Sequence, residues 1–380
     1  MSETGQYLAI GGVAAIVTFV TTPVVSTVAR RCNWVVEPDE RRIHTVATPD
    51  VGGIAMWIGF IAAMAAARLI GPFDPIFARN SEPSGVLIAA TLIFAVGLID
   101  DIWEISAPAK VAGTIAVAMV LVWKGVTMFY FRVPFQDVIF VSNSDWLPIV
   151  TIVWLLGMSQ AINLIDGLDG LAAGIVAIGA GAFFLYSTFL IDKGVLIAPT
   201  IGPLMSIITV GICVGFLPHN FNPARIFMGD GGALLLGLLL AVSTSVVGGR
   251  ADPSPLLSQP GQTYFFLAPL FIPLFILGVP ILDTLFAIVR RATRRQGVAT
   301  ADKKHLHHRL MEMGHGQRRS VLILWGWTAL LSAFVLYPVL TESSVSYVPI
   351  GAAMLGLALY TILHPQIRHE RANVPRATQD

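Results

Sequence analysis

The chain has 380 residues, of which 55% are hydrophobic and only 12% are charged. Soluble domains carry about 25% charged residues, so this composition excludes a water-soluble fold. The net charge of +1 says little, because the distribution of Lys and Arg matters more in a membrane protein, and the two cysteines, Cys32 and Cys213, are too few for a disulfide framework.

Apolar segments long enough to cross a bilayer, which takes about 20 residues, recur along the whole chain. The first lacks a preceding basic region and a clear cleavage site, so we interpret it as a retained span. The predicted fold class is an all-α polytopic membrane protein, with residues 1–364 forming a single integral-membrane catalytic domain. Hydropathy places about 11 transmembrane helices, at 6–28, 51–70, 84–100, 108–124, 146–163, 171–191, 198–217, 232–249, 265–289, 320–340 and 347–364.

One further apolar segment, 126–141, is not counted as a span. Arg132, Pro134 and Asp137 interrupt it, and its other residues favour β-structure and turns. We expect it to form an external hairpin or a re-entrant segment.

The basic residues predict the orientation of the chain. If the N-terminus lies outside, the loops at 29–50, 101–107, 164–170, 218–231 and 290–319 lie inside, and they carry most of the Lys and Arg side chains. Because these residues concentrate on the cytoplasmic side of membrane proteins, we predict a cytoplasmic C-terminus, with residues 365–380 as a mobile tail. Every acidic or histidine cluster that could do chemistry then lies on the cytoplasmic face.

The first such cluster is the pair Asp100 and Asp101, where the third span ends, with Lys110 at the start of the next span. Adjacent carboxylates repel each other, and a nearby lysine or Mg²⁺ ion would relieve that repulsion. A solvated helix end with a capping role is the alternative.

The second cluster is the sequence NLIDGLDG, which places Asn163, Asp166 and Asp169 at the inner end of the fifth span. The glycines let the backbone approach a ligand closely, and carboxylates three residues apart can point the same way in a helical loop. An ordinary Asp-Gly turn is the alternative, but the doubled motif favours a binding site.

The third cluster contains Asn220, Arg225 and Asp230, in a loop that leads into the eighth span. Helix N-termini attract phosphate, and Asp230 supplies a hard oxygen ligand for a metal ion. The alternative is that Asp230 only caps the helix.

The fourth cluster lies in the most basic inside loop and consists of His305, His307, His308 and Arg309. Guanidinium groups bind pyrophosphate in a bidentate manner, which suits a nucleotide substrate. The histidines could instead hold a transition metal, or the loop could form a basic surface facing lipid. His44 lies in another inside loop, which could close over a substrate or serve only as a basic anchor.

Carboxylates beside a His/Arg loop, with neither a P-loop nor a Ser-His-Asp order, indicate a site that handles phosphates with a divalent metal. Phosphoryl transfer fits best, because two unit charges about 4 Å apart repel by about 4 kcal/mol at an effective dielectric constant near 20 and need cations between them. A site at the mouth of membrane helices would admit a lipid acceptor from the bilayer and a soluble donor from the cytoplasm.

Five motifs in a fixed order, GLIDD, NLIDGLDGLAAG, FNPARIFMGD, PILDTLFAIVRR and DKKHLHHRL, resemble those of the polyprenyl-phosphate N-acetylhexosamine-1-phosphate transferases. This family includes the phospho-MurNAc-pentapeptide translocase. The likeness is greater to the bacterial branch that transfers GlcNAc 1-phosphate from UDP-GlcNAc, which typically has eleven spans and an H-x-H-H signature. Arg309 stands in place of the third of the translocase's adjacent histidines, which argues against a MurNAc-pentapeptide substrate.

The resemblance implies a Mg²⁺-dependent transferase of the bacterial inner membrane, with Mn²⁺ as an alternative ion. It makes Asp230 a metal ligand and places Asp100 and Asp101 at the acceptor phosphate and the metal, one of them as a general base. The predicted catalytic residues are Asp100, Asp101, Asp166, Asp169, His307 and His308. The predicted substrate-binding residues are Asn163, Asn220, Arg225, His305, Arg309, Lys110 and His44.

The expected reaction is attack by the lipid phosphate on the β-phosphorus of UDP-GlcNAc, which gives polyprenyl-diphospho-GlcNAc and UMP, the first membrane step of a cell-envelope glycan pathway. A covalent aspartyl-phosphate route stays open. The expected partners are the UDP-sugar, the polyprenyl phosphate and the membrane, without nucleic acid, and a homodimer is left open. The alternatives are phospho-MurNAc-pentapeptide transfer and, in another class, a secondary transporter, whose site usually lies near the bilayer midplane.

Overall fold

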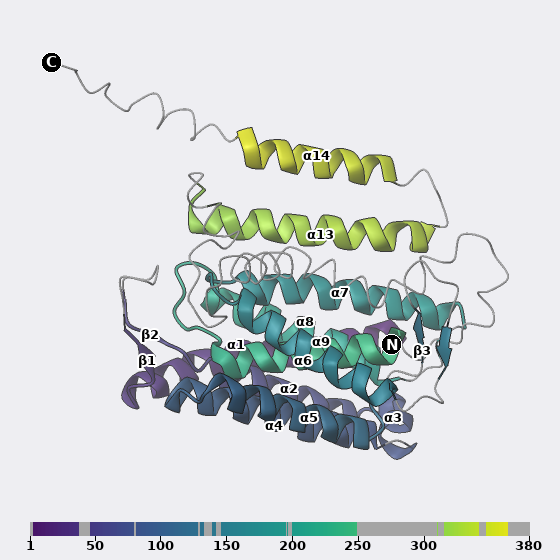
Figure 1. The fold of residues 1–380 in the computed structure, drawn as a ribbon, viewed down its shortest axis with the longest axis horizontal. Coiled ribbons are helices and arrows are strands. Elements are labelled where there is room, and N and C mark those ends of the chain that lie inside the picture. Colours follow the sequence, from purple (N-terminus) through teal and green to yellow (C-terminus); the bar gives the residue numbers. More distant parts are fainter. Residues whose placement is uncertain are drawn as a thin grey trace.

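The computed structural model describes residues 3–37, 46–79, 81–127, 130–132, 139–141, 146–194, 196, 200–248, 310, 315–341 and 347–363. Long helices lie side by side, and two short β-ribbons lie at opposite ends of the bundle (Figure 1). The described helices are α1 (Glu3–Arg31), α2 (Gly53–Leu69), the short 3₁₀ helix η1 (Gly71–Phe73), α3 (Asp74–Arg79), α4 (Glu82–Trp103), α5 (Ala107–Trp123), α6 (Leu147–Ile165), α7 (Leu171–Asp192), α8 (Ile201–Asn220), α9 (Gly229–Gly248), α13 (Gln317–Thr341) and α14 (Tyr347–Leu363).

Seven helices in the described part of the chain are long and apolar enough to cross a membrane: α1, α4, α6, α7, α8, α9 and α13. α2 is followed by a 92° bend into η1 and α3 and would be an eighth span if this bent pair crosses as one. α5 and α14 are shorter apolar helices. Each predicted span therefore coincides with a helix, except the one at 265–289, which lies outside the described residues. The total of 11 spans and their orientation stay predictions.

Several helices continue beyond the predicted ends of their spans. α4 continues to Trp103, so Asp101 lies in its last turn. The helix ends where Glu104 adopts a left-handed conformation (φ 50°) and its amide donates to the carbonyl of Asp100. In the same way, α8 extends to Asn220 and α9 begins at Gly229, which shortens the predicted loop 218–231.

The two ribbons show that the chain is mostly rather than entirely helical. β1 (Val35–Val36) pairs antiparallel with β2 (Thr48–Pro49), and β3 (Tyr130–Arg132) pairs antiparallel with β4 (Ile139–Val141). The pairing of β3 with β4 confirms that the segment 126–141 contains a hairpin. Its β-branched and aromatic residues favour strands. That this hairpin is external remains a prediction.

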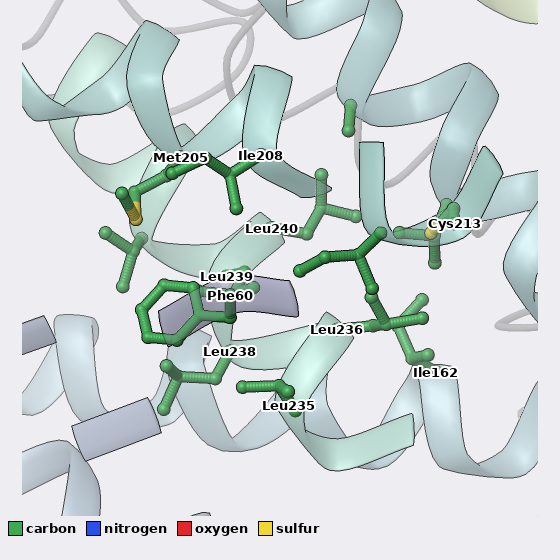
Figure 2. Packing of buried hydrophobic residues seen from close by; sticks show 14 of the residues in the cluster. Phe60, Ile162, Met205, Ile208, Cys213, Leu235, Leu236, Leu238, Leu239 and Leu240 are labelled. Atoms are coloured by element: carbon green, nitrogen blue, oxygen red, sulfur yellow. The ribbon is translucent and has the colours of Figure 1, made fainter. Parts of the chain in front are cut away.

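Helix α9 lies at the centre of the bundle, in contact with α2, α4, α6, α7 and α8. Beyond Asp230 it has no charged residue, and nearly all of its length is buried, as expected for a helix that is apolar on every face. Figure 2 shows its leucines packed among side chains of three neighbours. The labelled residues are Leu235, Leu236, Leu238, Leu239 and Leu240 of α9, with Phe60 of α2, Ile162 of α6, and Met205, Ile208 and Cys213 of α8.

The other helices form layers around this centre. α1 packs on α8 and α2, and α7 packs between α8 and α13, with α14 outermost (Figure 1). One face of α1 leaves large apolar side chains exposed, among them Ile16, Val20 and Val24, which suits contact with lipid.

Backbone hydrogen bonds tie the entrance of α2 to the entrance of α9. The amides of Gly52 and Gly53 donate to the carbonyls of Phe227 (2.9 Å) and Met228 (2.8 Å), and the amide of Phe227 donates to the carbonyl of Pro49 (2.8 Å). The residues just before α2 and α9 are therefore held together by backbone hydrogen bonds at this end of the bundle. The predicted acidic clusters lie near them.

Candidate functional site

Three helix ends contribute the charged side chains at the centre of the site. Lys110, in the first turn of α5, forms ion pairs with Asp100 in the last turn of α4 and with Asp230 in the first turn of α9. All three side chains are mostly buried. We call Asp100, Asp101, Lys110 and Asp230 the carboxylate–lysine cluster; the sequence predicted each member, and the structure brings them together.

Within this cluster, Asp101 contacts the backbone of α9. Its Oδ1 accepts a hydrogen bond from the amide of Asp230 (2.6 Å), and its Oδ2 accepts one from the amide of Gly231 (3.0 Å). The first amides of a helix have no partner within the helix, so Asp101 caps α9 from the neighbouring helix α4. The alternative that Asp230 only caps this helix is therefore not needed, because Asp101 supplies the cap.

Gly229, which opens α9, has a left-handed backbone (φ 67°). A Cβ atom at this position would collide with the carbonyl of Asp50 and the carboxylate of Asp101. A residue with a side chain would be strained by the backbone conformation and would also push Asp101 away, so glycine is required here.

The next group of contacts centres on Asn222, in the loop between α8 and α9. Its Nδ2 donates to Asp169 Oδ2 (2.8 Å) and to Gln317 Oε1 (2.6 Å), and its carbonyl accepts from Arg318 Nε (2.8 Å). Asp169 also accepts from the amide of Ala224 (3.1 Å). These bonds join the start of α13 to the loop after α6.

Asn220, the last residue of α8, joins the loop after α6 to the loop between α8 and α9. Its Oδ1 accepts from the amide of Gly170 (3.0 Å), and its Nδ2 donates to the carbonyl of Ile226 (3.0 Å), while the side chain is buried. We call Asp169, Asn220, Asn222 and Gln317 the amide cluster. Asn220 serves the loops here, so its predicted contact with substrate stays a prediction.

Two further carboxylates lie between these clusters. Asp166 follows the last residue of α6, and Asp50 precedes α2. Burial, and then the charges of Asp50, Asp230 and Asp169, raise the pKa of Asp166 well above its usual value. Asp50 also lies close enough to Asp101 for their charges to repel. This excess of negative charge favours a cation at the site.

The other predicted residues are placed as follows. Asn163 lies partly buried in the last turn of α6, just before Asp166. Arg225 has an exposed side chain, and its amide donates to the carbonyl of His219 (2.9 Å). The predicted residues outside the described part of the chain are His44, His305, His307, His308 and Arg309.

The sequence analysis did not select Asp50, Asn222, Gln317 or Arg318. Asn222 stands within the same motif as Asn220 and could have been found there. Asp50 lies just before the glycine pair that opens α2, much as Asp230 lies before the glycine pair of α9, and this parallel was a usable signal. Gln317 and Arg318 carry no recognisable motif.

The donor set suits a magnesium ion. Among the residues that the structure describes, no three His, Cys, Asp or Glu side chains come close enough together to hold a metal ion by themselves. Mg²⁺ is usually bound by one or two carboxylates, completed by water and substrate phosphates, and Asp100 and Asp230 converge on one point, where Lys110 lies. Asp101 directs both oxygens to backbone amides instead.

This fold and site define a multi-pass membrane protein with a carboxylate-rich centre at one end of its helix bundle. The model of glycosyl transferase family 4 matches residues 84–248. The chain belongs to this family, that of the polyprenyl-phosphate N-acetylhexosamine-1-phosphate transferases, as the resemblance in the sequence predicted.

Several relatives align along most of the chain. A decaprenyl-phosphate N-acetylglucosaminephosphotransferase of Mycobacterium leprae is 36% identical over 93% of this chain and 87% of its own length. A probable undecaprenyl-phosphate N-acetylglucosaminyl 1-phosphate transferase of Bacillus subtilis is 35% identical over 85% of this chain and 83% of its own length. A phospho-N-acetylmuramoyl-pentapeptide-transferase of Desulforudis audaxviator is 31% identical over 84% of this chain and 93% of its own length.

Proposed function

We propose that this chain transfers GlcNAc 1-phosphate from UDP-GlcNAc to a polyprenyl phosphate, giving polyprenyl-diphospho-GlcNAc and UMP. The observation that carries the proposal is the convergence of Asp100, Lys110 and Asp230 from three helices, in a chain that aligns with N-acetylglucosamine phosphotransferases along nearly its whole length. The relatives named for decaprenyl and undecaprenyl phosphate support a polyprenyl phosphate acceptor.

We propose that the site faces the cytoplasm. The helix ends that surround it carry Arg30 and Arg31 of α1 and Arg318 and Arg319 of α13, and the adjoining loop carries Arg225. Clusters of arginine at one end of a membrane bundle indicate its cytoplasmic side. A nucleotide donor would enter there from solution, and the acceptor lipid would reach the same end within the bilayer.

Asp230 and Asp100 are the residues that would hold Mg²⁺, and the ion would neutralise charge on the substrate phosphates. The chain itself adds a cation at this point, the ammonium group of Lys110. In the direct reaction, an acceptor phosphate oxygen bonds to the β-phosphorus of UDP-GlcNAc. The bond from that phosphorus to the bridging oxygen breaks, and UMP leaves with the bonding electrons.

The amide cluster would support the loops around the donor. Asn222 holds Asp169 against α13, and Asn220 holds the start of α7 against the loop that leads to α9. These contacts keep the loops after α6 and α8 at fixed distances. Asn220 and Asn222 would thus position the loops, while the catalytic role predicted for Asp169 stays a prediction.

The test offers the purified protein polyprenyl phosphate with UDP-GlcNAc, UDP-GalNAc or UDP-MurNAc-pentapeptide in separate reactions. UMP release and the mass of the lipid product are measured. The proposal expects GlcNAc-diphospholipid as the main product and no turnover with the pentapeptide donor. A lipid product bearing only the pentapeptide sugar would overturn the choice of donor, and absence of UMP with every donor would overturn the transfer reaction.

A second measurement separates the direct from the covalent route. Radiolabelled UMP is incubated with UDP-GlcNAc and protein in the absence of acceptor lipid. A covalent aspartyl intermediate exchanges the label into UDP-GlcNAc, whereas direct attack by the acceptor does not. We expect no exchange.

A further inference from the structure

The two adjacent acids at the end of α4 point to different partners. Asp100 pairs with Lys110 of α5, interacts with the side chain of Asp230 and accepts a hydrogen bond from the amide of Ile105 (2.8 Å). Asp101 faces α9, where its two oxygens accept from the amides of Asp230 (2.6 Å) and Gly231 (3.0 Å). The sequence suggested one shared role for the pair, but the geometry gives each acid its own.

The contact between α4 and α9 is close enough for Asp101 to reach backbone atoms. A Cβ atom on Gly97 would collide with the backbone of Asp230 and Gly231, so the two helices touch through their backbones. Gly97 and Asp101 are four residues apart and lie on the same face of α4. One face of α4 therefore contacts the start of α9 twice, through the backbone at Gly97 and through the Asp101 carboxylate.

The turn that Asp101 caps is the turn that carries Asp230. The Asp230 amide is held by Asp101, and the Asp230 side chain pairs with Lys110 from the other direction. Gly229 has a left-handed backbone, and Gly231 and Gly232 follow Asp230, so the sequence here does little to fix the turn by itself. The position of the Asp230 carboxylate then depends on the cap.

We propose that Asp101 is a positioning residue, which fixes the first turn of α9 and so aims Asp230, and that it contacts neither the substrates nor the metal ion. The link from Asp230 to turnover rests on the proposed function. The cap itself does not rest on it, so the two can fail separately.

The first test measures hydrogen exchange of the α9 amides in Asp101→Asn and Asp101→Leu. Asn retains one acceptor, and Leu has a similar size but none. We expect exchange in peptides covering residues 228–234 to speed up in the order wild type, Asn, Leu. The matched control is Thr244→Val, which removes a hydrogen bond from Trp154 Nε1 (2.8 Å) near the other end of α9 and should leave residues 228–234 unchanged.

The second test measures Mn²⁺ affinity by electron paramagnetic resonance, without substrates. Asp101→Asn should bind Mn²⁺ about 10-fold more weakly, as expected when a group that orients a ligand is altered. Thr244→Val should bind like wild type, and Asp230→Asn should lose most binding. In the transfer assay, Asp101→Asn should retain more activity than Asp101→Leu, because Asn keeps one acceptor for the amides of α9.

Three outcomes would overturn the proposal. The first is unchanged exchange at residues 228–234 in Asp101→Asn. The second is a loss of Mn²⁺ binding in Asp101→Asn as complete as in Asp230→Asn, which would make Asp101 a ligand. The third is equal inactivity of the Asn and Leu variants in the transfer assay, which would show that the carboxylate itself takes part in the reaction. If wild-type protein transfers no sugar phosphate, the proposed function fails, and the exchange data still decide the cap.

Discussion

The carboxylate–lysine cluster and the amide cluster lie in the same end of the bundle but are held by different forces. In the first, the ammonium group of Lys110 is set between two mostly buried carboxylates, and in the second, the carboxylate of Asp169 accepts from neutral amide groups. Removing a partner from a buried ion pair leaves an uncompensated charge, which costs more free energy than the unsatisfied acceptor that remains when a neutral donor is removed. Substitutions in the first cluster should therefore cost more than substitutions in the second.

The largest effect is expected for Asp230→Asn. Metal ions contribute several kcal/mol to phosphoryl transfer and each 1.36 kcal/mol is a factor of ten, so UMP release should fall by about 100-fold or more. The rate is measured at saturating Mg²⁺ on protein that elutes as a single species. A rate within a few-fold of wild type would contradict a metal-binding role for Asp230.

Lys110→Met should have the next largest effect and should act on stability as well as activity. It leaves Asp100 and Asp230 facing each other, and breaking a buried pair typically costs about 3–5 kcal/mol. The unfolding temperature in detergent and the UMP rate should both fall. The double variant Asp100→Asn with Lys110→Met should recover part of the lost stability. If its loss instead equals the sum of the single losses, the ion pair does not couple these residues.

A smaller effect is expected for Asn222→Ala. It removes the hydrogen bonds that Asn222 donates to Asp169 and Gln317, and the two acceptor oxygens lose this donor, at a cost of about 1–3 kcal/mol in stability. Because the affected loops would surround the donor, KM for UDP-GlcNAc should rise more than kcat falls. Asn222→Asp sharpens the comparison, since it places a second carboxylate beside Asp169 and should cost more than alanine. Equal effects of the two substitutions would show that charge is irrelevant in this cluster.

Asp166 should make the stability of the protein depend on pH. Its pKa is raised in the folded protein, chiefly by burial, so the folded chain retains a proton that the unfolded chain loses. With chelator present, the stability of wild type relative to Asp166→Asn should be highest below about pH 4, the ordinary aspartate range, and should fall as pH rises. Unfolding temperatures of both proteins across this range would show it, and a constant difference would contradict it.

The sequence predicted the helices well because each needs a long apolar segment, and this signal is local. It also predicted that Asp100, Lys110, Asp169 and Asp230 belong to a single site, because basic loops place them all on one face. The interruption of segment 126–141 by Arg132, Pro134 and Asp137 predicted either a hairpin or a re-entrant segment, and the structure has the paired strands of a hairpin.

Other features depend on contacts between distant segments. That Asp101 caps α9 follows from the closeness of α4 and α9 at Gly97, and no local pattern encodes this. The part played by Gln317 and Arg318 depends on how α13 packs against α7. Asp50 enters the site because the backbone before α2 pairs with that before α9.

The cap on α9 also bears on the order in which the chain is inserted into the membrane. Lys110 follows Asp100 by only ten residues, so the partner of Asp100 is synthesised almost at once. The amides that Asp101 binds lie 129 and 130 residues further along, so α4 waits through the synthesis of α5, α6, α7 and α8 before that carboxylate is satisfied. α9 is therefore the last of the three helices that carry the carboxylate–lysine cluster to be synthesised, and its arrival brings Asp230 to the other charged side chains.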